Sequence, residues 1–195
     1  EQGTRLAEVA TARGWDADNG GWYQSVARLA PHTPGPDPFV HWWIQMYGSF
    51  LQLQMYRVTG DPVYLQRFQA MESYFTRFFT DRQYGGVFIG VSHDGEFIGD
   101  GSKAEPWQTA YHEVEHGLLN YLYLNLYVND LPATLHLHFP ASDRPHKRFV
   151  SLVDDPTVLV TAVTVDGEPW QGFDAQERSV TLSPGSAVAV TVTLE

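Results

Sequence analysis

Apolar residues recur every three or four positions over several long stretches of the chain, which is the spacing of one face of an α-helix. These stretches predict four helices, at residues 4–13, 39–59, 62–80 and 107–128. Gly14 follows the first as a stop signal, and Gly60 follows the second. Asp61 then suits a helix cap and Pro62 a first helical turn, so the second and third helices are expected to be close neighbours.

Beyond Asn129 the period changes to two, which is typical of strands with one buried face. Five short strands are expected, at residues 134–139, 148–153, 157–165, 179–182 and 187–194. Turn dipeptides separate them, and strands at this spacing favour a small antiparallel β-sandwich. The sequence therefore predicts an α+β protein with two domains, a helical one at residues 1–129 and an all-β one at residues 130–195.

Two loops in the helical part share the pattern D-x-x-x-G-G-x-aromatic, at residues 16–23 and 81–88. Each loop follows a predicted helix, and their separation is longer than the period of the usual short helical repeats. The spacing fits paired long helices joined by an elaborated loop, the unit of an α/α barrel. Two unrelated glycine turns are the alternative. Residues 84–104 add short extended pieces around His93-Asp-Gly95, which predict a hairpin.

The composition narrows the function classes. The 195 residues carry a formal net charge of −11, and 43% of them are hydrophobic. Nucleic acid and anionic membranes are excluded as main partners, since both need a basic face. The chain has no cysteine, so disulfides and cysteine nucleophiles are excluded too. No apolar run reaches the roughly 18 residues that span a bilayer. We expect a cytoplasmic location, although the composition leaves the compartment open.

Residues 106–119 carry the densest candidate chemistry. His112 and His116 lie four residues apart, so they share one face of the predicted helix. Two imidazoles that titrate near neutrality, with Glu113 and Glu115 beside them, suit proton transfer on a small polar substrate. The letters His-Glu-Val-Glu-His also match the zinc-peptidase pattern H-E-x-x-H. The residues alone leave both interpretations open.

The zinc interpretation lacks a third ligand. A catalytic zinc normally takes three protein ligands, and the longer peptidase pattern would need histidine at Leu122. We expect no bound metal, while a ligand from another chain would revive the alternative. His136 and His138 alternate on one predicted strand, where a polar sheet face is expected. The other histidines are scattered and are expected to be exposed or to have local roles: His32, His41, His93 and His146.

Three motifs resemble the carboxyl-terminal third of the N-acylglucosamine 2-epimerase superfamily, which includes cellobiose 2-epimerases and aldose–ketose isomerases. Trp42-Trp-Ile-Gln45 resembles its W-W-x-Q motif. Asp81-x-x-x-Gly-Gly-Val-Phe88 with His93-Asp-Gly95 resembles its hairpin between late helices. Lys103-x-x-x-Trp107-x-x-x-Tyr111-His112 resembles its K-x-x-x-W-K-x-x-Y-H stretch. The order of the three motifs is what makes the resemblance specific.

The resemblance covers residues 4–128 and implies part of an (α/α)6 barrel. It implies a carbohydrate 2-epimerase or aldose–ketose isomerase that needs no cofactor and acts on a small carbohydrate. His112 would be the general acid/base that moves a proton beside the sugar carbonyl. Aromatic side chains would form a wall on which the sugar ring stacks. The implied substrate-binding residues are Trp42, Trp43, Gln45, Trp107, Tyr111, Glu115 and His116.

The chain also departs from the family pattern. The family's W-W-x-Q-x-E has an acid where Tyr47 stands, and its Y-H-x-x-R has arginine where Glu115 stands. Its second histidine lies on an earlier helix that we do not find in this chain. The chain begins at Glu1 inside a helical pattern and without Met. We therefore expect a fragment or processed chain, inactive alone, whose partner is the N-terminal remainder of the barrel; an ordinary mature N-terminus is the alternative.

Two further function classes stay open. An α/α barrel followed by a β-sandwich is also similar to some polysaccharide lyases and glycoside hydrolases. A glycosidase needs two carboxylates at a defined separation, and Glu113, Glu115 or Asp100 could supply one of them. The departures at Tyr47 and Glu115 would also fit a carbohydrate-binding relic that no longer catalyses.

Overall fold

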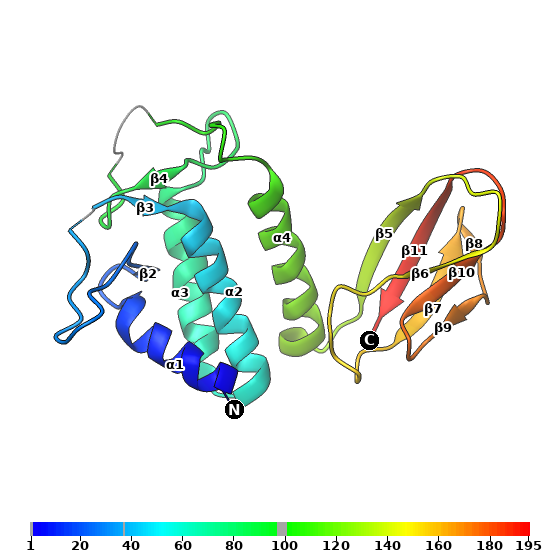
Figure 1. Ribbon diagram of the computed structural model, residues 1–195, viewed down its shortest axis with the longest axis horizontal. Helices are drawn as coiled ribbons and strands as arrows, with labels where there is room; N and C mark the ends of the chain where they lie inside the picture. The colour runs from blue at the N-terminus through cyan, green and yellow to red at the C-terminus, as the bar shows by residue number, and fades with distance from the viewer. Residues whose placement is uncertain (1, 37, 97–100) are drawn as a thin grey trace. The chain divides into compact units, whose positions relative to one another are not determined.

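The computed structural model describes residues 2–36, 38–96 and 101–195, and it mixes helices with antiparallel sheets (Figure 1). The fold class is α+β, as predicted. The chain divides into two compact units, Glu1–Asn120 and Tyr121–Glu195. This division falls within the fourth helix, ahead of the boundary near residue 130 expected from the sequence. The assignment of residues 1–129 and 130–195 as domains stays a prediction.

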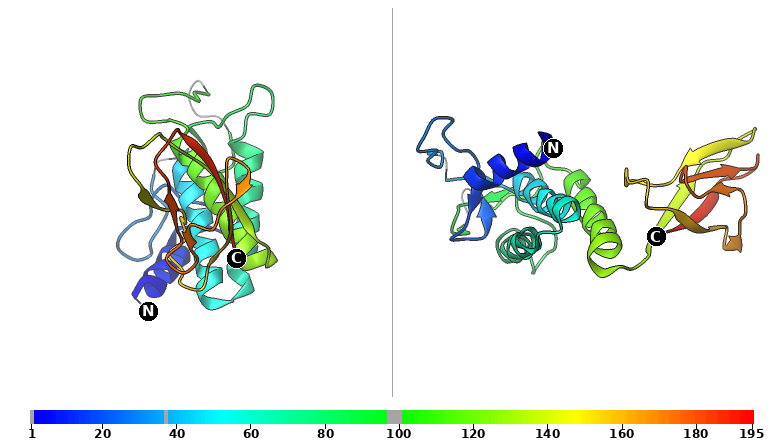
Figure 2. Two further views of the ribbon diagram at one scale, coloured as in Figure 1. Left: turned by 90° about the vertical axis from the view of Figure 1, so that its right-hand side faces the viewer. Right: turned by 90° about the horizontal axis from the view of Figure 1, so that it is seen from below.

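The first unit is built on α1 (Gln2–Gly14), α2 (Trp42–Thr59) and α3 (Pro62–Phe78). Gly60 ends α2 in the left-handed region, with φ of 69°. The Asp61 carboxylate accepts the Val63 N–H and caps α3, as its place before Pro62 predicts. Helices α2 and α3 therefore form a tight hairpin and lie side by side in each view (Figures 1 and 2).

The predicted helix at residues 107–128 begins four residues too early, while its end agrees with the end of the helical stretch at Asn129. Helix α4 covers Tyr111–Tyr123, and a π-helix over Leu124–Asn129 follows it. Its start is delayed because the Gln108 N–H donates to the Glu105 carbonyl at 3.0 Å, which closes a separate turn before the helix. The prediction thus gave the right element but left Trp107 on a helix, whereas Trp107 lies in this turn.

The two glycine loops that share a sequence pattern adopt the same turn. The Asp16 carboxylate accepts the backbone N–H groups of residues 18 and 19, and the Asp81 carboxylate accepts those of residues 83 and 84. In both loops the aspartate carbonyl accepts a glycine N–H, from Gly20 at 2.9 Å and from Gly85 at 3.0 Å. Both glycines have positive φ, 81° and 75°, which explains why glycine recurs at this place.

Two small ribbons hold these loops against the helices. Strand β1 (Trp15–Asp16) pairs with β2 (Gly21–Trp22), and β3 (Val40–His41) pairs with β4 (Gly90–Val91). The expected hairpin at residues 84–104 has its turn at Ser92, whose N–H donates to the Glu96 carbonyl. Its arms meet where the Ile89 N–H reaches the Ser102 carbonyl at 3.0 Å. Residues 97–100, including the candidate Asp100, lie outside the described part of the chain.

The core of the first unit is aromatic and lies between these ribbons and the α2–α3 hairpin. Its buried members are Trp22, Val40, Trp42, Met46, Met71, Tyr74, Phe75, Phe79 and Val91. Gln45 is fully buried beside them; its Oε1 accepts the Trp22 N–H at 2.8 Å, and its Nε2 donates to the Trp22 carbonyl at 2.9 Å. Because both polar atoms serve the backbone, the structure gives Gln45 a role in the fold.

The second unit holds two antiparallel sheets, with strand orders β6–β10–β9 and β5–β11–β7–β8. The bounds are β5 Ala133–Phe139, β6 His146–Phe149, β7 Val160–Val165, β8 Glu168–Pro169, β9 Phe173–Asp174, β10 Ser179–Leu182 and β11 Val188–Leu194. Four of the five predicted strands are present, three of them with a shifted end, whereas the strand predicted at residues 148–153 lies earlier, at His146–Phe149. The short β8 and β9 were missed, since two-residue strands carry no readable alternation.

Candidate active site

A pocket of about 480 Å³ opens in the first unit beside the start of α2. It is lined by His41, Trp42, Trp43, Tyr47, Ile89, Glu105, Trp107 and His112. Four of these were expected from the sequence: His112 and the three tryptophans. The structure thus brings together residues that lie up to 70 positions apart, and Gln45, Tyr111, Glu115 and His116 are not among the lining residues.

His112 lies in the first turn of α4 and sits among aromatic rings. Its imidazole packs edge-on to Trp42 at 5.9 Å and to Tyr47 at 5.5 Å between ring centroids. In the described part of the chain, His112 Nδ1 and Trp42 Nε1 are buried with no hydrogen-bond partner. Unpaired buried polar atoms are rare in proteins, and here both belong to pocket residues. A polar ligand is one way to pair them.

Glu115 on α4 accepts hydrogen bonds from two tyrosines, Tyr47 on α2 and Tyr111 on α4 itself. Its Oε2 accepts the Tyr47 hydroxyl at 2.8 Å, and its Oε1 accepts the Tyr111 hydroxyl at 3.2 Å. The hydrogen bond to the Glu115 carboxylate raises the pKa of Tyr47 to about 12. The same carboxylate lies 3.7 Å from His112 Nδ1. The two positions that depart from the family pattern therefore contact each other, next to the candidate acid/base.

His116 points to a different partner. Its Nε2 lies 2.9 Å from the Glu72 carboxylate on α3, and its side chain is 10% exposed. Ser49 and Asn120 also donate to that carboxylate. Burial favours the neutral form of Glu72, but the hydrogen bonds with His116, Ser49 and Asn120 outweigh it, so the pKa of Glu72 lies below its ordinary value. His116 is thus part of a link between helices.

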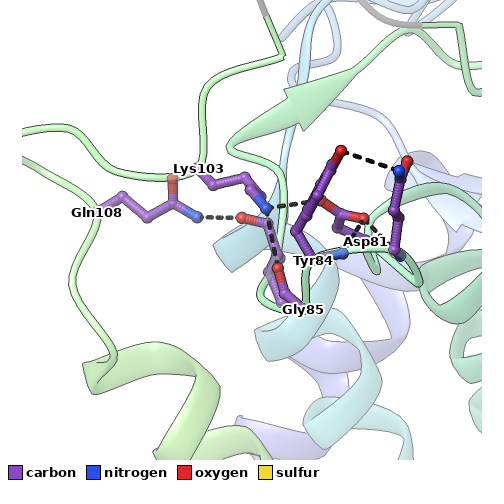
Figure 3. Close-up of polar contacts among 7 residues, drawn as sticks. Asp81, Tyr84, Gly85, Lys103 and Gln108 are labelled. Carbon is purple, nitrogen blue, oxygen red and sulfur yellow. Dashed lines mark hydrogen bonds and ion pairs between the residues drawn. The ribbon is translucent and has the colours of Figure 1, made fainter.

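The segment that carries Trp107 is tied to the preceding hairpin at several points. Figure 3 shows Lys103 Nζ reaching the Asp81 carboxylate at 2.6 Å and the Gly85 carbonyl at 3.0 Å. Gln108 Nε2 donates to the Val87 carbonyl at 2.8 Å, as Figure 3 also shows. Between these two anchors, Trp107 is 85% exposed and leaves a ring face open to a ligand. Lys103 of the motif therefore anchors a wall of the pocket.

Sequence reasoning missed four pocket residues: His41, Tyr47, Ile89 and Glu105. The expectation that His41 is exposed or has only a local role is wrong, since it is half-buried and lines the pocket. Its direct proximity to Trp42 in the sequence was the available signal. Ile89 and Glu105 lie on loops whose course no periodicity describes.

The remaining candidates form no metal centre in the part of the chain that the structure describes. Within residues 2–36, 38–96 and 101–195, no group of three or more His, Cys, Asp or Glu is placed to hold a metal ion. Glu113 lies near Gln108, with its Oε2 buried and unpaired among the described residues. None of the helices described here has the length and hydropathy needed to cross a bilayer.

The pocket combines two histidines, aromatic walls and a single carboxylate, which suits an uncharged polar ligand with a ring. Sugars present such a surface, with C–H groups that stack on aromatic faces and hydroxyls that pair with polar atoms. Imidazole is also the side chain that most often serves as a general acid or base. This geometry is compatible with more than one reaction on a sugar.

The family model of N-acylglucosamine 2-epimerase matches residues 1–115. The human (Homo sapiens) N-acylglucosamine 2-epimerase is 31% identical over 101 residues, which are 51% of this chain and 23% of the human protein. The chain therefore spans about a quarter of the length of this curated relative.

Solved structures agree at the level of the fold. The cellobiose 2-epimerase from Spirochaeta thermophila DSM 6192 has a TM-score of 0.52 at 22% identity, over 61% of this chain and 29% of that protein. A D-mannose isomerase has a TM-score of 0.51 at 20% identity, over 57% and 28%. Because the family model matches more than half of the sequence, this chain belongs to the N-acylglucosamine 2-epimerase family.

Proposed function

We propose that this chain forms part of a carbohydrate 2-epimerase or aldose–ketose isomerase in which His112 is the general acid/base. The observation that carries the proposal is the pocket that holds His112 together with Trp42, Trp43 and Trp107. Relatives named as sugar epimerases and as a mannose isomerase support the reaction class.

The chemistry requires a base beside the carbon next to a sugar carbonyl. Removing that proton leaves an enolate, which is an enediolate where carbon 2 carries a hydroxyl. Giving a proton back to carbon 2 from the other face yields the epimer, and giving one to carbon 1 of the enediolate yields the ketose. Imidazole suits both steps because its ordinary pKa lies near neutral pH. Trp43 and the exposed face of Trp107 are the surfaces on which the sugar ring would stack. No metal or cofactor is part of this proposal.

The Tyr47–Glu115 contact supports catalysis over a binding relic. If the family's acid and arginine had been replaced independently at these two positions, the new side chains would be left unpaired beside His112. Here the Tyr47 hydroxyl donates to the Glu115 carboxylate at 2.8 Å. On this proposal the pair holds α2 and α4 together around the pocket. Tyr111 and Glu115, expected from the resemblance to bind substrate, would then support the site from outside its lining.

We also propose that the helical unit is part of an α/α barrel, that the second unit is a β-sandwich, and that turnover needs the remaining barrel. The support is the apolar surface left on the helices, where Trp43, Tyr47, Tyr111 and Val114 are 39%, 43%, 62% and 64% exposed. An N-terminal barrel segment, in the same protein or another chain, would cover them. Residues 1–195 alone should then show no turnover.

Nuclear magnetic resonance in deuterated water tests the proposed function. The complete protein that contains this chain is incubated with N-acetylglucosamine, glucose or cellobiose, and deuterium at carbon 2 and the formation of epimer or ketose are followed. Deuterium beside the carbonyl together with product supports the proposal. Cleavage of a glycan instead would favour a lyase or hydrolase, and sugar binding without exchange would favour a relic.

A further inference from the structure

The two ring nitrogens of His112 have different surroundings. Its Nδ1 is buried without a hydrogen-bond partner among the described residues. Its Nε2 is not one of these buried atoms, and the side chain lines the pocket with 26% of its surface exposed. Nε2 is therefore the nitrogen that a sugar can reach. It can take up a proton only when the hydrogen of the neutral ring is on Nδ1, so the tautomer of His112 decides whether this residue can act as a base.

A carboxylate lies beside Nδ1. Glu115 Oε2 is 3.7 Å from this nitrogen, three residues further along α4. This distance is longer than a hydrogen bond, but it brings a negative charge to that side of the ring. A lone pair on Nδ1 would be repelled by the oxygen, whereas an N–H there is attracted to it. The contact therefore favours the tautomer with the hydrogen on Nδ1.

Two tyrosines hold the Glu115 carboxylate in this place. The Tyr47 hydroxyl donates to Oε2 at 2.8 Å, and the Tyr111 hydroxyl donates to Oε1 at 3.2 Å. A carboxylate has about four acceptor sites, so it can accept a further hydrogen after these two bonds. The rings of both tyrosines also pack edge-on to the His112 imidazole, at 5.5 Å and 5.1 Å between centroids. The same two side chains thus fix both the carboxylate and the imidazole.

In the described part of the chain, Glu115 is the one carboxylate at ion-pair distance from His112 Nδ1. Glu113 comes directly after the histidine, so it points to another side of α4, and its Oε1 lies 3.5 Å from Gln108 Nε2. Glu113 has the same charge and lies on the same helix, which makes it a matched control. The family pattern has arginine at position 115, so a carboxylate that supports the histidine from this position is a feature of this chain.

We propose that Glu115 is a positioning residue for His112, which keeps the hydrogen of the neutral imidazole on Nδ1 and leaves the lone pair of Nε2 toward the sugar. The inference rests on the proposed function of His112 as the general acid/base. Glu115 itself does not touch the sugar, since it lies outside the pocket lining.

The proposed step moves one proton. Nε2 takes the proton from the carbon beside the sugar carbonyl, and the bonding pair stays on the sugar as an enolate. The imidazolium then carries a hydrogen on each nitrogen, and the Nδ1–H of this cation is attracted more strongly to the Glu115 carboxylate. No proton passes to Glu115. Contacts that support a base often shorten when the substrate is bound, so the 3.7 Å separation should close to a hydrogen bond there.

Nitrogen NMR of the imidazole rings tests the assignment without relying on turnover. The complete protein is labelled with ¹⁵N-histidine, and the signals of His112 are identified by their absence from His112→Asn. Spectra are recorded at alkaline pH, where imidazole is neutral. We expect the parent to carry the hydrogen of His112 on Nδ1 and the lone pair on Nε2. A parent with the hydrogen on Nε2 would overturn the proposal, and this measurement needs no variant of Glu115 to fold.

Three variants separate the carboxylate from general effects of substitution. Glu115→Leu removes the acceptor, so the hydrogen should move to Nε2 or be shared between the two nitrogens. Glu115→Gln keeps an acceptor oxygen on a side chain of the same length and should restore most of the parent tautomer. Glu113→Leu should leave the tautomer unchanged. Thermal unfolding shows which variants are folded. A folded Glu115→Leu with the parent tautomer, or an equal shift in Glu113→Leu, would contradict the proposal.

Kinetics connect the tautomer to turnover. For Glu115→Leu we expect kcat to fall by about 10²–10⁴-fold, the usual effect of losing a working acid/base group. KM should change by less than about threefold, because Glu115 lies outside the lining and its loss affects the transition state alone. A shifted tautomer with the parent kcat would show that Glu115 does not position the base. If the parent turns over no sugar, the proposed function fails, while the nitrogen spectra still decide whether Glu115 sets the tautomer of His112.

Discussion

Single side chains decide how the pocket works, and Glu115 is the clearest case. A carboxylate at this position would repel a family-type acid at position 47, yet Tyr47 supplies a hydroxyl instead. Since a phenol can donate to a carboxylate, the two departures are compatible with each other. Glu115 is thereby held 3.7 Å from His112 Nδ1 without lining the pocket.

His112→Asn in the complete protein should lower sugar turnover by about 10²–10⁴-fold while sugar binding changes little. Asparagine keeps much of the volume and hydrogen bonding of histidine but cannot exchange protons near neutral pH. His116→Asn should reduce turnover less, because His116 pairs with Glu72 instead of lining the pocket. Turnover and sugar affinity are measured for both. A larger loss for His116→Asn would overturn this division of roles.

Glu115→Gln should lower the pKa of Tyr47 from about 12 toward its ordinary value of 10.0. The carboxylate stabilises the protonated phenol as a charged acceptor, and a neutral amide does so less, so the phenol would ionise at lower pH. Titration of Tyr47 by ultraviolet absorbance at alkaline pH, compared with a Tyr47→Phe background, gives the shift. Glu113→Gln is the control, and an equal shift in that variant would contradict the assignment.

At the scale of elements, a partly buried network of polar groups links three helices of the first unit. Glu72 on α3 accepts from Ser49 on α2 and lies 2.9 Å from His116 on α4. One carboxylate therefore contacts three helices. A carboxylate is costly to bury alone but stabilising when it is paired. Its removal should therefore lower the free energy of unfolding of the whole first unit.

Glu72→Gln should destabilise the first unit by about 1.5–3 kcal/mol, the range for hydrogen bonds to charged groups. The pKa of Glu72 is lowered on folding, so the unfolded chain binds the proton more tightly. Its contribution is therefore present above the ordinary carboxyl pKa and is lost as the pH falls through the lower folded value. Thermal unfolding from pH 7 down to pH 3 should show a steeper acid loss for the parent than for the variant. Parallel curves would contradict this.

Gly48→Ala should destabilise the protein by about 1–3 kcal/mol, the usual range for overpacking. A β-carbon at Gly48 on α2 would lie 2.2 Å from Trp22 Nε1, too close without movement of the indole. Gly117→Ala on α4 is the matched control, because nothing lies within 4 Å there. Alanine is also the better helix former by up to about 1 kcal/mol, so this variant should be neutral or stabilising. Equal melting temperatures would contradict the close contact.

At the scale of the whole molecule, charge and metal content bear on function. The net charge of −11 is consistent with a small uncharged substrate and disfavours nucleic acid, which needs a basic face. The His-Glu-Val-Glu-His letters fit a zinc helix, but His112 lines the pocket while His116 reaches Glu72. A zinc pair at this spacing must converge on one ion, whereas His116 Nε2 is engaged by the Glu72 carboxylate at 2.9 Å.

Removal of metal should therefore leave sugar turnover unchanged. The complete protein is treated with a chelator and dialysed, and turnover is compared before and after with elemental analysis of bound zinc. We expect activity within about twofold of the untreated protein, since general acid/base catalysis by histidine needs no metal. Near-stoichiometric zinc that is lost together with activity would favour the peptidase alternative.

The sequence by itself determined the features that depend on residues close together in the chain: helix periods, caps, strand alternation and motifs. The 3.6-residue period, the Asp61–Pro62 cap and Gly60 placed the α2–α3 hairpin, and alternation placed four of the five main strands. The order of the Trp42 and Trp107 motifs was enough for the family, which the match to residues 1–115 confirms. These signals survive in a single sequence because caps, periods and motifs are local.

Only the tertiary structure decided which of these residues meet. In the folded chain Gln45 is hydrogen-bonded to Trp22 in the core, and His41 lines the same pocket as His112. Glu115 accepts a hydrogen bond from Tyr47. None of these contacts joins residues on the same turn of a helix or on adjacent positions. They depend on how loops without periodicity cross the helix ends, and on which polar atoms burial leaves to be paired. A residue type at a motif position therefore fixes its chemistry, while its role is set by the partner that packing supplies.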